Sequence, residues 1–139
     1  MSVDERSGWR DLGLSIRHRL WGHDCPIVDI DFLVVEYDEK KPIALVEYKH
    51  EHAKNPNFDD ANYTTLKTLG DWAGLPVFNA RYADDYSWFK LTPLNAMAEA
   101  RLPPEHRMMT ERQYVDFLYW LRGRLIPPEV QFDGERLRT

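Results

Sequence analysis

Two apolar segments joined by a short polar turn constrain this chain more than any other feature of its sequence. Residues 27–37 and 42–49 are rich in β-branched and aromatic side chains, and residues 38–41 between them are all charged. This composition favours β-strands, and so short a turn favours a hairpin. Both segments are apolar at odd and even positions along most of their length, so we expect helices on each face of the sheet.

Proline, glycine and capping residues divide the rest of the chain. We expect helices over residues 7–21, 59–73, 93–100 and 110–122, and strands over residues 77–82 and 87–92. Thr110 and Gln113 form a capping box, and Leu66, Leu69 and Ala73 form the apolar stripe of the second long helix. The predicted fold is α/β and close to α+β, with a mixed four-stranded sheet flanked by helices in the order αββαββα.

Length and composition fit one domain. The chain has 139 residues, of which 43% are hydrophobic, which is enough for one packed core. We expect a domain over residues 1–125 and a polar, mobile tail over residues 126–139. The single cysteine, Cys25, allows no intramolecular disulfide, and no segment reads as a signal peptide or membrane span. We therefore expect a cytoplasmic protein without membrane contact.

Polar residues interrupt the apolar hairpin near its open end. Glu47 and Lys49 are two residues apart, so their side chains point to the same face of a strand. A turn centred near residues 39–40 places Asp31 opposite either Glu47 or Lys49, depending on the register. Asp29 lies one pair further out, so it is the second choice after Asp31 for a partner of the Glu-Lys pair.

These side chains suit a hard divalent cation. Two carboxylates at the end of a sheet are ligands for Mg²⁺ or Mn²⁺, and the backbone carbonyl of Tyr48 offers a third oxygen. A neighbouring lysine can orient an attacking water or stabilise charge that develops on phosphorus. The pattern therefore indicates phosphodiester hydrolysis. The alternative is that Glu47 and Lys49 form an ordinary charge pair at the end of a strand.

The chain has Asp31, then fifteen intervening residues, then Glu47-x-Lys49, on a predicted hairpin that follows a predicted N-terminal helix. This pattern resembles that of the PD-(D/E)XK nuclease superfamily. Its members include restriction endonucleases, Holliday-junction resolvases and small phage nucleases. The resemblance covers roughly residues 7–92. It implies a restriction endonuclease-like core and a Mg²⁺-dependent DNA endonuclease of phage or bacterial type, in which Asp31 and Glu47 bind the metal and Lys49 assists the attacking water.

The resemblance also implies accessory residues. Members often add an acidic residue from the first helix, for which Glu5 and Asp11 are the nearby candidates. Some relatives place a polar residue on the helix after the lysine strand, and here Asn62, Tyr63 and Lys67 are candidates of that type.

Basic side chains are candidates for contacts with phosphate. We expect Arg17, Lys67 and Arg81 to lie nearest to bound DNA. The net charge of −5 argues against nonspecific coating of nucleic acid, which usually requires a basic domain. Metal-binding carboxylates add negative charge that the ion neutralises, so a nuclease is still compatible with this charge. RNA is an alternative substrate that the sequence does not separate from DNA.

The last predicted helix carries aromatic side chains on more than one face, namely Tyr114, Phe117, Tyr119 and Trp120. Such a helix must be buried somewhere, which favours a homodimer or a protein partner bound through residues 110–122. A rival interpretation is a catalytically silent module of the same fold that binds a partner through this helix. His50 and His52 lack further zinc ligands at suitable spacing, so we expect them to be solvated loop residues.

Overall fold

A computed structural model describes residues 12–22, 30–130 and 132 of the chain. It contains helices α1 (Leu12–Leu20), α2 (Ala61–Ala73), α3 (Ala96–Arg101) and α4 (Glu111–Leu121), and strands β1 (Phe32–Glu36), β2 (Lys41–His50), β3 (Val77–Tyr82), β4 (Phe89–Pro93) and β5 (Met108–Met109). A 3-10 turn at Pro104–His106 precedes β5. The protein therefore has a mixed α/β fold that is compatible with an α+β description.

The strands form one mixed sheet in the order β1-β2-β3-β4-β5. β1 and β2 form the predicted antiparallel hairpin, and α2 then crosses to β3, which runs parallel to β2. β4 and β5 add antiparallel neighbours. The predicted count of four strands was wrong by one, because β5 has only two residues and is too short to show a periodic pattern.

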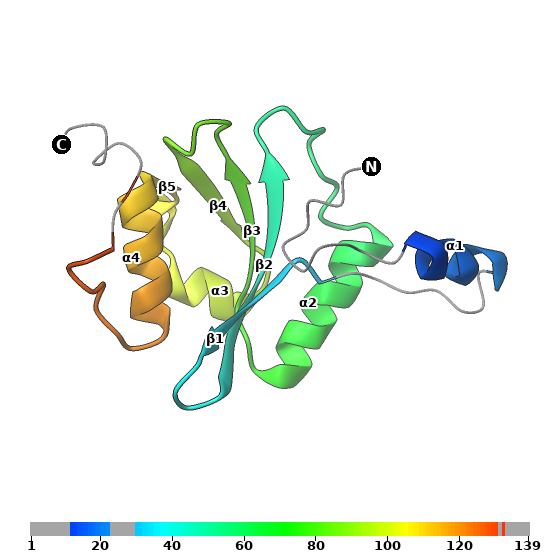
Figure 1. The fold of residues 1–139 in the computed structure, drawn as a ribbon, viewed down its shortest axis with the longest axis horizontal. Coiled ribbons are helices and arrows are strands. Elements are labelled where there is room, and N and C mark those ends of the chain that lie inside the picture. Colours follow the sequence, from blue (N-terminus) through cyan, green and yellow to red (C-terminus); the bar gives the residue numbers. More distant parts are fainter. Residues whose placement is uncertain (1–11, 23–29, 131, 133–139) are drawn as a thin grey trace.

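Helices cover both faces of the sheet, as the apolar hairpin predicts (Figure 1). Even-numbered residues of β2, such as Ala44 and Val46, belong to the core under α3 and α4. The odd-numbered Leu45 packs with Leu66 of α2 on the opposite face. α1 lies beyond α2, away from the sheet (Figure 1). Side chains of β2 therefore alternate between an α4 face and an α2 face.

α2 approaches the sheet through a glycine. Gly70 is buried, and a Cβ at this position would lie 2.2 Å from Cγ2 of Val77. Only a residue without a side chain allows this contact. The predicted apolar stripe of α2 was partly wrong, because Leu69 and Ala73 are exposed while Gly70 and Tyr63 face the sheet.

α4 begins at the predicted capping box, in which Thr110 and Gln113 exchange hydrogen bonds between side chain and backbone. Its aromatic side chains largely pack within the chain. Tyr114 is buried in the core and Phe117 packs against the same core, whereas Trp120 is 56% exposed and stacks on Phe117. Internal packing thus accounts for most of the aromatic content of residues 110–122, and a partner or homodimer at this helix stays a prediction.

Two contacts that the sequence did not indicate hold C-terminal residues against the domain. Glu36 at the end of β1 is 1% exposed and binds Arg124 at 2.7 and 2.9 Å and Arg122 at 3.2 Å. Burial raises the pKa of Glu36, but the hydrogen bonds from Arg124, Arg122 and the backbone of Asp38, together with the charge of Arg124, outweigh it and leave the pKa lowered. Phe132, in the expected tail, is buried, and its ring lies under the guanidinium of Arg112.

Candidate functional site

Asp31 and Glu47 lie together at the open end of the hairpin. Phe32 pairs with Val46, so the next pair outward joins Asp31 with Glu47. Oδ2 of Asp31 accepts a 3.1 Å hydrogen bond from the backbone N–H of Tyr48, which holds the carboxylate against β2. Of the two registers allowed by the sequence, the structure adopts the one in which the two carboxylates face each other.

Glu47 has the most perturbed carboxyl group of this site. Burial raises the pKa of Glu47, and the charge of Asp31 and a hydrogen bond with Asp31 raise it further. The Lys49 cation lowers the pKa, and the net result is a value of about 7. Asp31 is exposed and Glu47 is partly buried. Two such neighbouring carboxyl groups repel each other when both are ionised, and a bound cation relieves that repulsion.

Lys49 and Tyr48 point to opposite faces of β2. Glu47 and Lys49 lie on the α2 face, where both are partly buried. The ring of Tyr48 lies on the α4 face and meets Tyr114 of α4 edge to face. Only the backbone of Tyr48 therefore lies between the two charged side chains, and its carbonyl is still the third oxygen expected at the site.

Tyr63 and Asn79 form the wall behind the carboxylates. Asn79 is 3% exposed and pairs in register with Glu47, and the Tyr63 hydroxyl donates a 3.0 Å hydrogen bond to Oδ1 of Asn79. Burial, followed by the charges of Glu47, Asp60 and Asp31, raises the pKa of Tyr63 to about 12. Tyr63 therefore remains a hydrogen-bond donor at neutral pH. The resemblance suggested Tyr63. Asn79 and Arg81 are two residues apart on β3, so they share a face, and this alternation is the signal in the sequence that points to Asn79.

Arg81 supports the loop that follows β2. Its guanidinium donates hydrogen bonds of 2.9 to 3.3 Å to the backbone carbonyl oxygens of His50, Glu51, Ala53 and Lys54 and to Oδ1 of Asn55. Both terminal nitrogens are thus engaged within the chain. The structure gives Arg81 a role in ordering this loop, and a contact with phosphate stays a prediction.

Replacing Arg81 with methionine should release the loop. The variant keeps an unbranched apolar side chain but loses every donor of the guanidinium, so amide hydrogen exchange over residues 51–55 should accelerate about tenfold or more. Hydrogen exchange measured by mass spectrometry tests this. Arg101→Met, at an exposed position on α3, is the matched control and should leave the exchange unchanged. Equal exchange in both variants would show that Arg81 does not order the loop.

Among the other candidate residues that the structure describes are Lys67 and Arg17. The side chain of Lys67 on α2 is 25% exposed, and its Nζ lies 3.8 Å from Oδ1 of Asp59, which precedes that helix. Arg17 is exposed on α1. Asp29, the second choice for the metal, lies outside the described residues, as do Glu5 and Asp11.

Comparison of the chain with family models, with curated proteins and with solved structures finds no match. Within residues 12–22, 30–130 and 132, no group of three or more His, Cys, Asp or Glu side chains is arranged to hold a metal ion. The candidate site thus offers two carboxylates, of Asp31 and Glu47. No helix in the described part of the chain is long and apolar enough to cross a membrane.

Proposed function

We propose that this chain is a metal-dependent nuclease of the PD-(D/E)XK type, with a restriction endonuclease-like core, which hydrolyses phosphodiester bonds in DNA. The observation that carries the proposal is the facing of Asp31 with Glu47, with Lys49 on the same side of the strand. The connection from this hairpin through α2 to a parallel strand also supports it, because that arrangement agrees with the core implied by the resemblance.

The donor set fits Mg²⁺ or Mn²⁺. Mg²⁺ is usually held by one or two carboxylates and keeps the rest of its coordination for water and substrate phosphate, which is what Asp31 and Glu47 would leave open. When bound, the ion supplies Lewis-acid stabilisation of the charge that develops on the phosphoryl group. The carbonyl of Tyr48 adds a third candidate oxygen.

The side chains around the metal site have separate roles. Lys49 orients the attacking water and offsets negative charge through its ammonium group. Tyr63 and Asn79 position Glu47 from behind, because Asn79 is buried in register with it and Tyr63 fixes the amide through a hydrogen bond. Each of these side chains projects from a regular element, which keeps the site rigid.

Cleavage assays test the proposal directly. Single-stranded, duplex and branched DNA, with RNA in parallel, would be incubated with the purified chain in Mg²⁺ or in EDTA. We expect cleavage of DNA only with the metal, and a loss of about 10²- to 10⁴-fold in Lys49→Ala. Lys90→Ala, at an exposed position on β4, should cleave at the normal rate. Metal-dependent cleavage that survives Lys49→Ala would refute the site assignment, and cleavage of RNA alone would refute the choice of DNA.

A further inference from the structure

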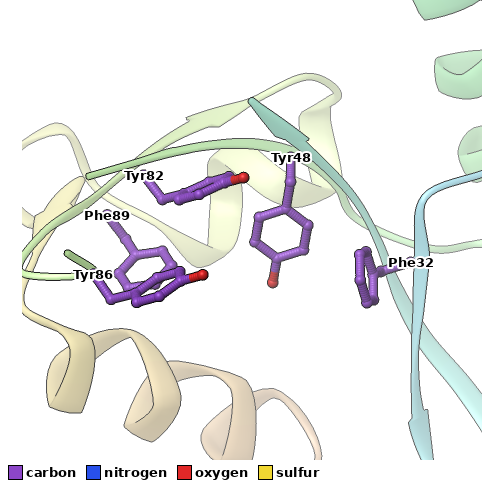
Figure 2. A pocket seen from close by; sticks show the side chains of 5 residues that line it. All are labelled: Phe32, Tyr48, Tyr82, Tyr86 and Phe89. Carbon is purple, nitrogen blue, oxygen red and sulfur yellow. The ribbon is translucent and has the colours of Figure 1, made fainter. Parts of the chain in front are cut away.

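An aromatic pocket lies on the α4 face of the sheet, behind the carboxylate site. It has a volume of about 240 Å³ and is lined by Phe32, Tyr48, Tyr82, Tyr86 and Phe89 (Figure 2). These side chains come from β1, β2, β3, the β3–β4 turn and β4. Five aromatic rings from separate segments therefore converge on one cavity, and each lining residue in the described part of the chain is aromatic.

The rings form a floor and a rim. Phe89 is 8% exposed at the floor, and Tyr82 stacks on it and on Tyr86, with ring centroids 6.3 and 5.9 Å apart. Phe32 meets Tyr48 edge to face at 4.9 Å. The two rim residues, Phe32 and Tyr86, are 58% and 47% exposed. Ring faces at the rim are thus accessible to a ligand.

The rim residue Tyr86 is held in an unfavourable backbone conformation. Its φ is 62°, in the left-handed region that bulky residues rarely adopt. Its N–H donates to the carbonyl of Ala83 at 2.9 Å, and the neighbouring Asp84 is fixed by His50 at 2.7 Å. Such strain persists only where the surroundings impose it, and it concentrates at ligand sites. The turn therefore presents the Tyr86 ring in a fixed position.

The lining selects a flat, uncharged ligand with polar edges. Among residues 12–22, 30–130 and 132, no charged side chain lines the pocket, so these residues offer no counter-charge to a phosphate or carboxylate there. Tyrosine hydroxyls supply the polar groups, and Figure 2 shows the hydroxyl ends of Tyr82 and Tyr86 directed toward Tyr48. A nucleobase has these properties, and each of the bases can stack on an aromatic ring.

The pocket is also adjacent to the candidate site through the backbone. Phe32 follows Asp31 directly, and Tyr48 lies between Glu47 and Lys49. Successive Cα atoms are about 3.8 Å apart and successive side chains of a strand point to opposite faces. The carboxylates and the aromatic pocket are therefore the two sides of the same strand ends.

We propose that this pocket binds an unpaired nucleobase of a nucleic-acid strand whose backbone reaches Asp31, Glu47 and Lys49. The inference rests on the proposed function and narrows its substrate to single-stranded or locally unpaired nucleic acid. A base within an intact duplex is stacked on both faces and cannot enter such a pocket without leaving the stack.

Binding measured without metal separates this inference from catalysis. The full chain would be titrated in EDTA against a short fluorescent oligothymidylate, and against the same strand in a duplex, with anisotropy as the readout. We expect the single strand to bind more tightly, and Tyr86→Ala and Phe32→Ala each to weaken its binding by roughly 5- to 150-fold. Both side chains are half exposed, and thermal melting would verify that the variants are folded.

Tyr37→Ala is the matched control, because Tyr37 is 77% exposed in the β1–β2 turn at the other end of the hairpin. It should bind the oligonucleotide normally. The inference would be overturned by equal affinity for single strand and duplex, or by unchanged binding in both pocket variants. Displacement of the oligonucleotide by tetramethylammonium would also overturn it, because it would identify a cation site. If the pocket variants lose binding but the wild type cleaves nothing, the base site stands and the proposed nuclease function fails.

Discussion

Replacing Glu47 with glutamine is expected to lower the rate of metal-dependent cleavage by about 10³-fold or more. The same change should make the metal-free protein more stable in mild alkali. Glutamine keeps the size of the side chain but removes the charge that would bind the ion. It also removes the repulsion from Asp31, which contributes to the raised pKa of Glu47. Loss of activity with a gain of stability is typical of a functional site and not of a structural ion pair.

The pH dependence of stability follows from the pKa of Glu47, which is about 7 in the folded protein instead of its ordinary value of 4.5. Between these values the folded protein binds a proton that the unfolded chain does not, so stability of the wild type should fall as pH rises from 4.5 to 7. Thermal unfolding in EDTA at about pH 5 and about pH 8 measures this fall, which should shrink in Glu47→Gln. Mg²⁺ at the higher pH should stabilise only the wild type. Identical pH and metal responses in the two proteins would refute this prediction.

Replacing Phe78 with alanine should cost the most stability of any change considered. Phe78 is fully buried on β3 and stacks edge to face with Phe117 of α4, so it joins the sheet to its covering helix. Truncation of a buried phenylalanine costs about 3 to 5 kcal/mol, a large share of the roughly 5 to 15 kcal/mol that stabilises a typical domain.

Urea unfolding would measure this loss against Phe32→Ala. Phe32 is 58% exposed on β1, so the same change of residue there should cost far less. Similar midpoints for the two variants would show that β3 and α4 do not form the central core. The comparison also shows whether Phe32→Ala folds stably enough to be used in the binding experiment.

The local elements were predictable because their signals lie within a few residues. The strand predicted over residues 77–82 is confirmed as β3, and the capping box at Thr110 marks the start of α4. The expected first strand began at residue 27, whereas β1 begins at Phe32, and residues 23–29 lie outside the described part. The spacing within the hairpin limited the partner of Asp31 to Glu47 or Lys49, and only the strand register chose between them.

Contacts between segments far apart in the chain could not be predicted from local sequence patterns. Glu36 meets Arg124 across 88 positions of the chain, and no local periodicity encodes that pair. The aromatic pocket was missed for a similar reason. Tyr82 and Phe89 look like core residues in sequence, and only the arrangement of the sheet leaves their rings open to a cavity. The hydrogen bonds of Arg81 to the loop after β2 join residues about 30 positions apart, so the sequence did not predict them, and its contact with phosphate stays a prediction.

The central claim is that Asp31 and Glu47 share a divalent cation. The most direct measurement is an anomalous difference map from crystals of the full chain soaked in Mn²⁺, compared with crystals of Glu47→Gln treated in the same way. The claim predicts a strong peak between the Asp31 and Glu47 carboxylates in the wild type and none in the variant. A wild-type map without a peak at this position, or an equal peak in both proteins, would contradict it.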